Sequence, residues 1–317
     1  MFLCVSPNPA IDKRVALTSL GRGQVNRVRT MQSFPGGKSS HVAMVLQTLG
    51  ANPHWIGPHG GSSGQELVTG LSALGIRVKG FPSTQPTRTN LEIVEEDGTV
   101  TEILEPGSTL YLKEWDAFES AYRELLSSAA EKTTVIFSGS LPAGTPTDLY
   151  ARFIAVAREF PCETFVDASG EALRQAFRAR PCFVKPNSEE AAQLLGTTVD
   201  STHKATDAIG KLLELGARSA ALSLGPEGLL FCASVNAPIL FAPAPALKPR
   251  STVGCGDSAL AGFAFGIASN FSPSDTLQLA AACAAANCLA DSPGAARLED
   301  IRDFQSRISV KVLASSP

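Results

Sequence analysis

The sequence lacks a long apolar run, a concentrated basic region and a leader-like start. Its 317 residues carry a net charge of −3, which excludes the basic face expected of a nucleic-acid or membrane-surface binder. The most apolar internal stretches, 258–269 and 277–290, are Ala-rich and too short to cross a bilayer. The apolar residues 1–5 stop at Pro7 without a basic flank, so we expect a buried strand there and not a signal peptide.

A paired cysteine pattern is also lacking. The seven cysteines are scattered along the chain, and none of them forms a Cys-x-x-Cys pair. An odd and scattered set argues against both a disulfide framework and a structural zinc site. We therefore expect a protein of the reducing cytoplasm, with no nucleic-acid or membrane partner.

What the sequence does contain, from about residue 134, is an alternation of short apolar runs with amphipathic stretches. Strands are expected at 134–138, 163–167, 183–185 and 220–224, and helices at 149–160, 171–179 and 189–195. This alternation predicts βα units, and so one α/β domain over 1–317 with a mostly parallel sheet between helices. Ligands of such sheets bind at the carboxyl ends of the strands.

Two segments break this alternation. Residues 11–34 alternate like a strand and lack helix signals, and residues 87–104 do the same around a turn at Asp97-Gly98. We expect the two insertions to join as a small sheet that acts as a lid beside the ligand cleft. Exposed edges of such a sheet favour pairing with a second copy, so a homodimer is expected.

The most informative local motif is the segment 251–258, which precedes an apolar helix at 259–267. Gly254 and Gly256 let the backbone approach a ligand and aim several N–H groups at it, as an anion hole for a phosphoryl group requires. Asp257 would then lie in the first helical turn, within reach of a hydroxyl. The same residues also suit an ordinary helix N-cap, and no Gly-Lys-Ser/Thr closes the segment as in a Walker A loop.

This segment resembles the C-terminal signature of the ribokinase-like (PfkB) carbohydrate kinases, and the resemblance extends in chain order over about residues 3–300. The other matching segments are Asn8–Asp12, Gly36–Lys38 with His41–Ala43, the glycines 57, 60, 61 and 64, Thr87–Asn90, Ser138–Pro142, Lys185–Glu190 and Ser223–Gly228. Asn8–Asp12, Thr87–Asn90 and Asp167–Leu173 look most like the branch acting on phosphorylated hexoses. That branch includes 1-phosphofructokinase, tagatose-6-phosphate kinase and the minor 6-phosphofructokinase.

The resemblance implies a three-layer α/β/α sandwich with a small β-sheet lid. It also implies ATP-dependent phosphorylation of a hexose phosphate, for example fructose 1-phosphate to fructose 1,6-bisphosphate, or a tagatose-6-phosphate kinase reaction. Asp257 would be the base that activates the acceptor hydroxyl. The backbone of Gly254, Cys255 and Gly256 would stabilise the transferring group, with ATP and Mg²⁺ as the donor. The Cys255 side chain would be a small apolar filler or, alternatively, a redox-active thiol.

On the substrate side the resemblance points to seven residues: Asp12, Gly36, Gly37, Lys38, His41, Arg88 and Ser140. Asp12 would accept hydrogen bonds from sugar hydroxyls. Lys38 and Arg88 would supply positive charge for the phosphate already on the substrate, and the Ser140 hydroxyl could bond the same phosphate. Taken singly, Asp12 is also consistent with a solvated turn residue, Lys38 or Arg88 with a surface cation, and Ser140 with a turn-forming serine.

On the nucleotide side the resemblance points to Lys185, Asn187, Ser223, Gly225, Gly228 and Asn287. Asn187 and Glu190 would organise Mg²⁺ through water, although their spacing is also that of a capping box, and both roles can coexist. Lys185 ends an apolar strand, where it would meet nucleotide phosphate or simply solvent. Asn287 would edge the adenine pocket or lie on a helix surface.

The family pattern breaks in one place. After Gly36-Gly37-Lys38 it continues with Gly, a variable residue and Asn, whereas this chain has Ser39, Ser40 and His41. Ser39 replaces a residue that takes positive φ freely, and His41 is larger than Asn and can titrate. Two alternatives thus stay open. One is a kinase for an unphosphorylated sugar or nucleoside, against which the two cations Lys38 and Arg88 argue. The other is a catalytically weak sugar-phosphate-binding regulator, which the intact Asp257 segment opposes.

Overall fold

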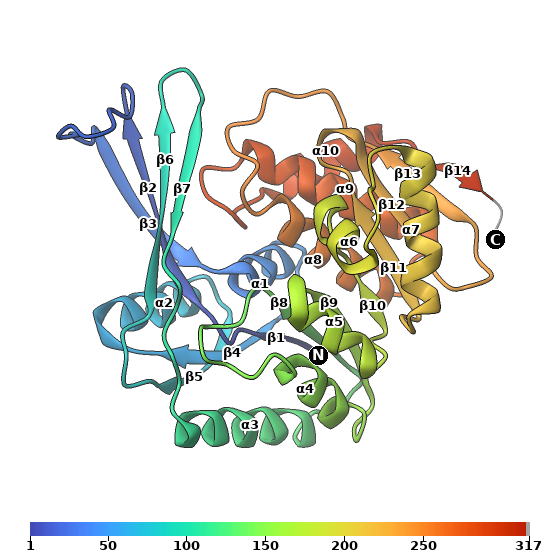
Figure 1. Cartoon of the computed structure of the whole chain (residues 1–317), viewed down its shortest axis with the longest axis horizontal. Helices are drawn as coiled ribbons and strands as arrows, with labels where there is room; N and C mark the ends of the chain where they lie inside the picture. The colour runs from blue at the N-terminus through green and yellow to red at the C-terminus, as the bar shows by residue number, and fades with distance from the viewer. Residues whose placement is uncertain (315–317) are drawn as a thin grey trace.

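The computed structural model describes residues 1–314 and is built on a large twisted sheet (Figure 1). Its strand order is β14-β13-β12-β11-β10-β9-β8-β1-β4-β5. The strands are β1 (Phe2–Val5), β4 (His54–His59), β5 (Arg77–Pro82), β8 (Thr133–Ser138), β9 (Cys162–Asp167), β10 (Phe183–Val184), β11 (Ser219–Ser223), β12 (Gly228–Cys232), β13 (Ile239–Pro243) and β14 (Lys311–Ala314). From β5 to β11 all neighbours are parallel, and β12, β13 and β14 add an antiparallel edge.

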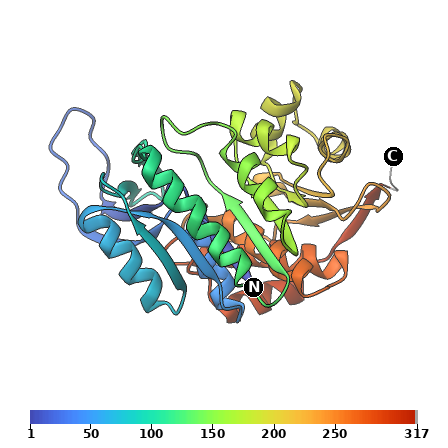
Figure 2. The ribbon, with the colours of Figure 1, turned by 90° about the horizontal axis from the view of Figure 1, so that it is seen from below.

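Helices cover both faces of this sheet (Figure 2). One layer holds α1 (Lys38–Thr48), α2 (Gly61–Ala73), α8 (Cys255–Ala268), α9 (Pro273–Leu289) and α10 (Leu298–Arg307). The other holds α3 (Leu112–Ser127), α4 (Leu149–Ala157), α5 (Gly170–Arg178), α6 (Ser188–Leu195) and α7 (Thr202–Glu214). Alternate strand residues point to opposite faces, so Leu3 and Val5 join one apolar cluster while Cys4 joins the other. The expected three-layer α/β/α arrangement is confirmed.

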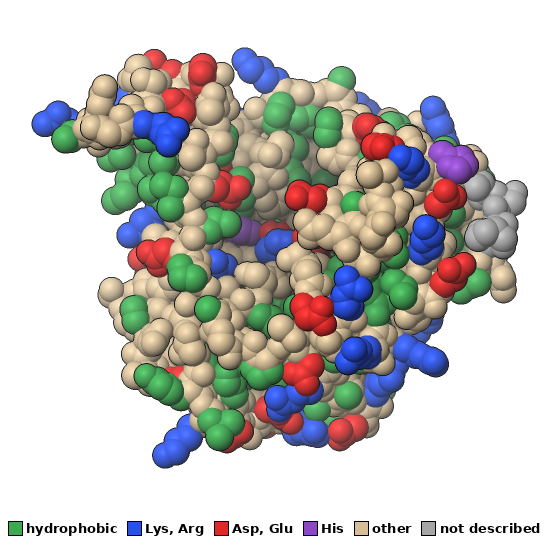
Figure 3. Space-filling model, in the orientation of Figure 1, with side chains coloured by type: hydrophobic (Ala, Val, Ile, Leu, Met, Phe, Trp, Pro, Cys, Tyr) green, Lys and Arg blue, Asp and Glu red, His purple; other side chains and the backbone are tan. Residues whose placement is uncertain are grey.

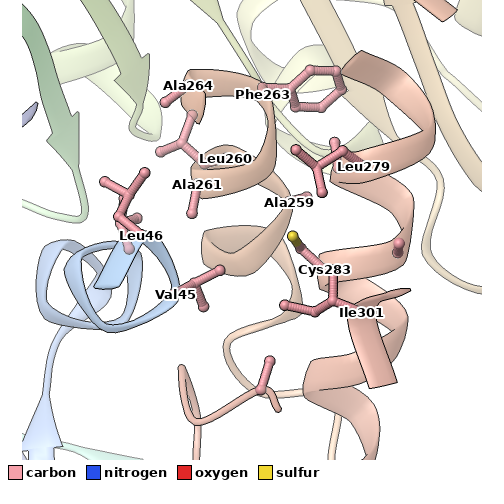
Figure 4. Close-up of a cluster of buried hydrophobic side chains, with 14 of the residues drawn as sticks. Val45, Leu46, Ala259, Leu260, Ala261, Phe263, Ala264, Leu279, Cys283 and Ile301 are labelled. Atoms are coloured by element: carbon pink, nitrogen blue, oxygen red, sulfur yellow. The ribbon is translucent and has the colours of Figure 1, made fainter. Parts of the chain in front are cut away.

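Helices α8 and α9 pack closely because small residues line their contact (Figure 4). A side chain at Gly262 would bring a Cβ within 2.6 Å of the Ala280 Cα, so the two backbones nearly touch at this point. Phe263, Leu279 and Ile301 complete the buried cluster. This packing holds α8, and with it the segment that begins the helix, rigidly against the sheet.

The two insertions join as a separate four-stranded sheet of order β3-β2-β6-β7, called the small sheet below. It is formed by β2 (Ala10–Leu17), β3 (Thr30–Gly36), β6 (Arg88–Glu95) and β7 (Val100–Leu104), and it stands out to one side of the body (Figure 1). The strand-like alternation expected over residues 11–34 was only partly right, because residues 25–29 lie in the loop before β3. The Val25 side chain is 81% exposed there, so the alternation reflected no buried face.

The strands and helices expected between residues 134 and 224 lie at β8, β9, β10, β11, α4, α5 and α6, with small differences at their ends. Within residues 1–314, no helix combines the length and the apolar character needed to cross a membrane.

Candidate active site

A cavity of about 1010 Å³ lies between the small sheet and the large one. Figure 3 shows this hollow, with a histidine and basic and acidic side chains inside it. Ser138, Asp167 and Ser223 line the cavity and are the last residues of β8, β9 and β11. The cavity therefore lies at the carboxyl ends of parallel strands, where the sequence predicted a ligand site.

The start of α8 forms one wall of this cavity. Gly254 is the N-cap residue with φ of 80°, and a Cβ there would lie 2.8 Å from the Pro293 Cβ, so the turn requires glycine. The Cys255 N–H donates to the Thr252 carbonyl, but the first N–H groups of a helix have no intrahelical acceptor. Gly256 and Asp257 follow on the cavity wall. The positive end of α8 therefore faces the space where an anion would lie.

Asn287 braces this turn from behind. Its Nδ2 donates to the Val253 carbonyl at 2.8 Å, and its Oδ1 accepts from the Gly294 N–H at 2.8 Å. The side chain is buried, which rules out the helix-surface interpretation, and it is not on the cavity wall. The expected contact with adenine thus does not fit this placement. The amide instead joins the α8 turn to the segment after α9.

A continuous chain of hydrogen bonds runs from the small sheet to α8. Asn90 faces Asp12 across the parallel strands β6 and β2, and its Nδ2 donates to Asp12 Oδ1 at 2.8 Å. The His41 Nε2 lies 2.9 Å from Asp12 Oδ2, and the His41 Nδ1 lies 2.8 Å from Asp257 Oδ2. His41, in the first turn of α1, thus contacts both the expected sugar-binding carboxylate and the expected base.

The two carboxylates determine the charge of His41. Burial alone would lower its pKa, but the hydrogen bonds and charges of Asp12 and Asp257 raise that pKa to about 10. Burial alone would raise the pKa of Asp12, yet His41 and Asn90 lower it below its ordinary value. Near neutral pH His41 is therefore an imidazolium beside the ionised Asp12 carboxylate.

The turn before α1 places His41 in this position. Gly36 must lack a side chain, because its Cβ would lie 2.3 Å from the Asp12 carboxyl group, and Gly37 is the N-cap with φ of 86°. Ser39 is not at a positive φ, so the concern about losing glycine there is removed. It lies inside the helix and is buried, with its Oγ 2.6 Å from the Val5 carbonyl and 2.9 Å from the Ser138 carbonyl.

Arg88 and Asn8 both line the cavity, and their side chains lie close together. The Arg88 guanidinium donates to the Glu105 and Asn8 carbonyl oxygens at 2.9 and 3.2 Å, and within residues 1–314 it forms no ion pair. Burial lowers the Arg88 pKa, although Asp12 and Glu105 oppose that shift. The Asn8 Nδ2 donates to Ser140 Oγ at 3.3 Å. A half-buried cation without a carboxylate partner is thus directed at the cavity.

Several cavity-lining side chains hold buried polar atoms that have no hydrogen-bond partner among residues 1–314. These atoms are Asn8 Oδ1, Arg88 Nε, Asn90 Oδ1 and Ser138 Oγ. Such orphaned donors and acceptors are costly unless a ligand or water satisfies them. Their mixture of donors and acceptors matches a ligand that carries hydroxyl groups and an anionic group.

The opposite side of the cavity is built around Asp167. Lys185 Nζ lies 2.9 Å from Asp167 Oδ2, and Lys38 Nζ lies 3.9 Å from Asp167 Oδ1 and 4.0 Å from Glu190 Oε1. A Cβ at Gly256 would lie 3.5 Å from Lys185 Nζ, so this ammonium group borders the anion-binding turn. Asp167 chiefly raises the pKa of Lys38. Lys185 is buried and not solvated, which excludes the interpretation as a solvent-exposed strand end.

Asn187 and Glu190 form a capping box at the start of α6. Asn187 Oδ1 accepts from the Glu190 N–H at 2.8 Å, and Glu190 Oε2 accepts from the Asn187 N–H at 2.9 Å. Burial, with the charge of Asp167, raises the Glu190 pKa. Ser223, Gly225 and Gly228 follow at the β11–β12 turn and line the same side of the cavity.

Sequence reasoning missed several residues of this site. Asn8 and Asn90 were inside recognised motifs, but neither was assigned a role. Asp167 was used only to recognise the branch, although it pairs with two lysines. No sequence motif pointed to Glu92. It is buried, pairs with Arg14 at 2.7 Å and accepts from Ser251 Oγ at 2.7 Å, which ties the small sheet to the segment before α8.

Comparison with known proteins assigns the family. A model of the pfkB family carbohydrate kinases matches residues 8–300. The chain belongs to this family. Its 317 residues are thereby identified as an ATP-dependent carbohydrate kinase with a ribokinase-like fold, and the resemblance inferred from the motifs is confirmed.

Solved structures agree with this assignment. A provisionally named phosphofructokinase from Staphylococcus aureus is 28% identical with a TM-score of 0.82, covering 99% of this chain and 100% of its own. Phosphofructokinase-2 from Escherichia coli is 25% identical with a TM-score of 0.89, covering 97% and 98%. A possible 1-phosphofructokinase from Thermotoga maritima, 22% identical, shares the fold with a TM-score of 0.87 over 99% of both chains. These neighbours match the hexose-phosphate kinase branch.

Proposed function

We propose that this kinase phosphorylates a hydroxyl group of a hexose phosphate. The observation that carries the proposal is Arg88, a half-buried guanidinium on the cavity wall that bonds only two carbonyl oxygens in the described chain. A guanidinium in that state has donors directed at the cavity and no counter-anion, which suits a phosphate. A neutral sugar would leave its charge uncompensated. Fructose 1-phosphate, tagatose 6-phosphate and fructose 6-phosphate all fit this requirement.

The acceptor hydroxyl would be activated by Asp257. Its Oδ2 is held by His41, so Oδ1 is the oxygen available to take the hydroxyl proton. The N–H groups of Gly256 and Asp257 and the ammonium group of Lys185 would stabilise charge on the transferring phosphoryl group. Most of the rate enhancement would then come from positioning and electrostatics.

The small sheet would act as the lid. Its residues Leu91, Glu102 and Leu104 line the cavity across from the α8 turn, so closure there would exclude water that competes as acceptor. Burial raises the Glu102 pKa, which is consistent with a partly enclosed position. A lid that contributes Asp12 and Arg88 would also couple substrate binding to closure.

ATP would occupy the side lined by Ser223, Gly225 and Gly228. The donor set fits a Mg²⁺ ion that keeps its waters, because within residues 1–314 no three His, Cys, Asp or Glu side chains gather as a direct cage. Asn187 and Glu190 would hold the ion through water, and bound Mg²⁺ would neutralise phosphate charge. Their capping box would keep both side chains fixed for that role.

We expect a homodimer through the lid. The edge strands β3 and β7 each have an unpaired side in the described structure, and Met31 on β3 and Ile103 on β7 are 59% and 54% exposed. A second copy is the occupant that would cover such an edge. Sedimentation velocity should give a dimer that dissociates in Ile103→Glu, and a monomeric parent protein would exclude this assembly.

The proposal is tested by measuring ADP release with ATP and Mg²⁺ against a substrate panel. The panel holds the three phosphohexoses, the matching free sugars, ribose and adenosine, with Asp257→Asn as the inactive control. Turnover on one phosphohexose far above the rest supports the proposal and names the substrate. Turnover on a neutral sugar alone would contradict it, and silence with tight binding of a phosphohexose would favour the regulator.

A further inference from the structure

His41, on α1, bonds the small sheet through one ring nitrogen and α8 through the other. Asp12 and Asn90 belong to the small sheet, whereas Asp257 belongs to α8. The hydrogen bonds from Asn90 to Asp12 to His41 to Asp257 measure 2.8, 2.9 and 2.8 Å. Because the buried His41 ring contacts Asp12 at one nitrogen and Asp257 at the other, neither carboxylate can move freely.

An imidazolium is the form of His41 that can donate to both carboxyl groups at once. Each ring nitrogen faces a carboxylate oxygen, and an ionised carboxylate can only accept. A neutral imidazole has one N–H and would leave one of the two contacts repulsive. The surrounding charges agree: Asp12 on β2 and Asp257 on α8 face the ring, Glu102 on β7 lies farther off, and Arg88 on β6 acts on Asp12.

We infer that His41 is a positioning residue which, as an imidazolium, fixes Asp257 Oδ2 and ties the proposed base to the small sheet, leaving Oδ1 for the acceptor hydroxyl. This inference rests on the proposed function for its catalytic consequence, but not for the imidazolium bridge. An asparagine in this position, as in the usual family pattern, could not replace it. Its amide oxygen would face one of the carboxylates as a second acceptor, and its nitrogen could donate in one direction only.

The bridge is observable without substrate. The chain has four histidines, so ¹⁵N-histidine NMR should resolve four rings, and His→Asn variants assign them. In the parent protein, His41 should stay protonated at both nitrogens to well above pH 8, with a titration midpoint of about 10. In Asp12→Asn this midpoint should fall. His203, which is 87% exposed, is the reference ring. A His41 ring that titrates near His203 would overturn the bridge whether or not the enzyme is active.

The positioning role is tested by kinetics on whichever substrate the panel identifies. His41→Asn should lower kcat by roughly 10- to 100-fold while KM for ATP changes little, because misplacing a base costs rate more than binding. His41→Gln serves as the second variant if the first folds poorly, and His203→Asn is the control. An unchanged kcat in an active parent enzyme would refute the positioning role. A silent panel with a protonated His41 would instead refute the proposed function and leave the bridge intact.

A second, independent observation concerns two thiols beside the same turn. Cys255 begins α8 and Cys288 lies near the end of α9, and their Sγ atoms are 3.2 Å apart. Both residues line the cavity. A disulfide needs an S–S separation of about 2.05 Å, so a movement of the two sulfur atoms by about 1 Å in total would suffice.

We propose that Cys255 and Cys288 form a reversible disulfide under peroxide, which halts the enzyme by displacing the anion-binding turn. The Cys288 thiolate attacks hydrogen peroxide, giving a sulfenic acid and hydroxide. The Cys255 thiol then displaces water as the S–S bond forms, so two thiols and one peroxide give one disulfide and two waters. The hydrogen bond from Cys255 lowers the pKa of Cys288, which identifies it as the attacking thiol.

The test is peptide mapping of the full-length protein after peroxide treatment. A linked peptide pair containing Cys255 and Cys288, with at least a tenfold loss of turnover that dithiothreitol restores, is the expected result. Cys288→Ser should keep its activity under peroxide, while Cys162→Ser should not. The proposal would be overturned by a disulfide elsewhere, such as Cys162 to Cys182, or by oxidation of Cys288 without a disulfide. Peptide mapping needs no turnover, so this result does not depend on the proposed catalytic function.

Discussion

Lys185 and Asp167 form a buried ion pair at the floor of the cavity. Their Nζ and Oδ2 atoms are 2.9 Å apart, and each side chain is 3% exposed. A pair so far from water is rarely retained for stability alone, because desolvation consumes most of the attraction. Lys185 instead borders the Gly256 turn, where the proposed function puts the transferring phosphate, and Asp167 holds it there.

Removing one partner of this pair should be more harmful than removing both. Lys185→Met leaves Asp167 with only the more distant Lys38, so we expect a loss of unfolding free energy of about 3 kcal/mol, at the lower end for a broken buried pair. Lys185→Met/Asp167→Leu should recover much of that stability but no activity. Urea unfolding of the three proteins measures this. A double variant less stable than Lys185→Met would show that the pair itself is stabilising.

Asp257→Asn should abolish turnover while ATP still binds. An amide cannot accept the hydroxyl proton as a carboxylate does, and general-base catalysis contributes about 10²- to 10⁴-fold. ATP affinity, measured calorimetrically, should change little because the backbone turn is unaltered. Asp275→Asn is the matched control, since Asp275 is also an acid in a first helical turn but lies outside the cavity. Turnover by Asp257→Asn at the parental rate would refute the assigned base.

Arg88→Gln should discriminate between charged and neutral substrates. Losing a charge-assisted contact to phosphate costs about 1.5–3 kcal/mol, or roughly 10- to 100-fold in KM for a phosphohexose. KM for any neutral sugar turned over should hardly change. Arg29→Gln, which removes an exposed cation paired with Glu96, controls for net charge. Equal effects on both substrate types would show that Arg88 supports the fold and not the phosphate.

His41 should also make stability depend on alkaline pH. Its folded pKa is raised above the ordinary value of 6.5, so its stabilising contribution is complete below about pH 6.5 and is lost as pH rises through about 10. The melting temperature of the parent should fall across that window, and the fall should be smaller in His41→Asn. Asp12 has the opposite effect in acid, because its folded pKa lies below the ordinary value of 3.8. Its stabilising contribution is complete above pH 3.8 and is lost as pH falls through the folded pKa. Identical alkaline slopes in the two proteins would contradict the buried charge.

The sequence by itself determined the fold class, the family and most of the charged residues that line the cavity. The βα alternation fixed the parallel sheet, because buried strands and amphipathic helices carry distinct periodicities. The glycines at 36, 37 and 254 indicated a close backbone approach or a positive φ that a residue with a Cβ would not tolerate. These signals are local, so they are readable along one chain.

Only the tertiary structure decided how those residues meet. Nothing in the sequence shows that His41, 29 residues from Asp12 and 216 from Asp257, bonds both carboxylates. Ser39 looked like a loss of glycine freedom, yet its hydroxyl bonds carbonyls at the ends of β1 and β8. Asn287 looked like a ligand contact, yet it braces the α8 turn. Side-chain partners depend on which strands and helices the fold brings together, and that is a property of long-range packing, not of local pattern.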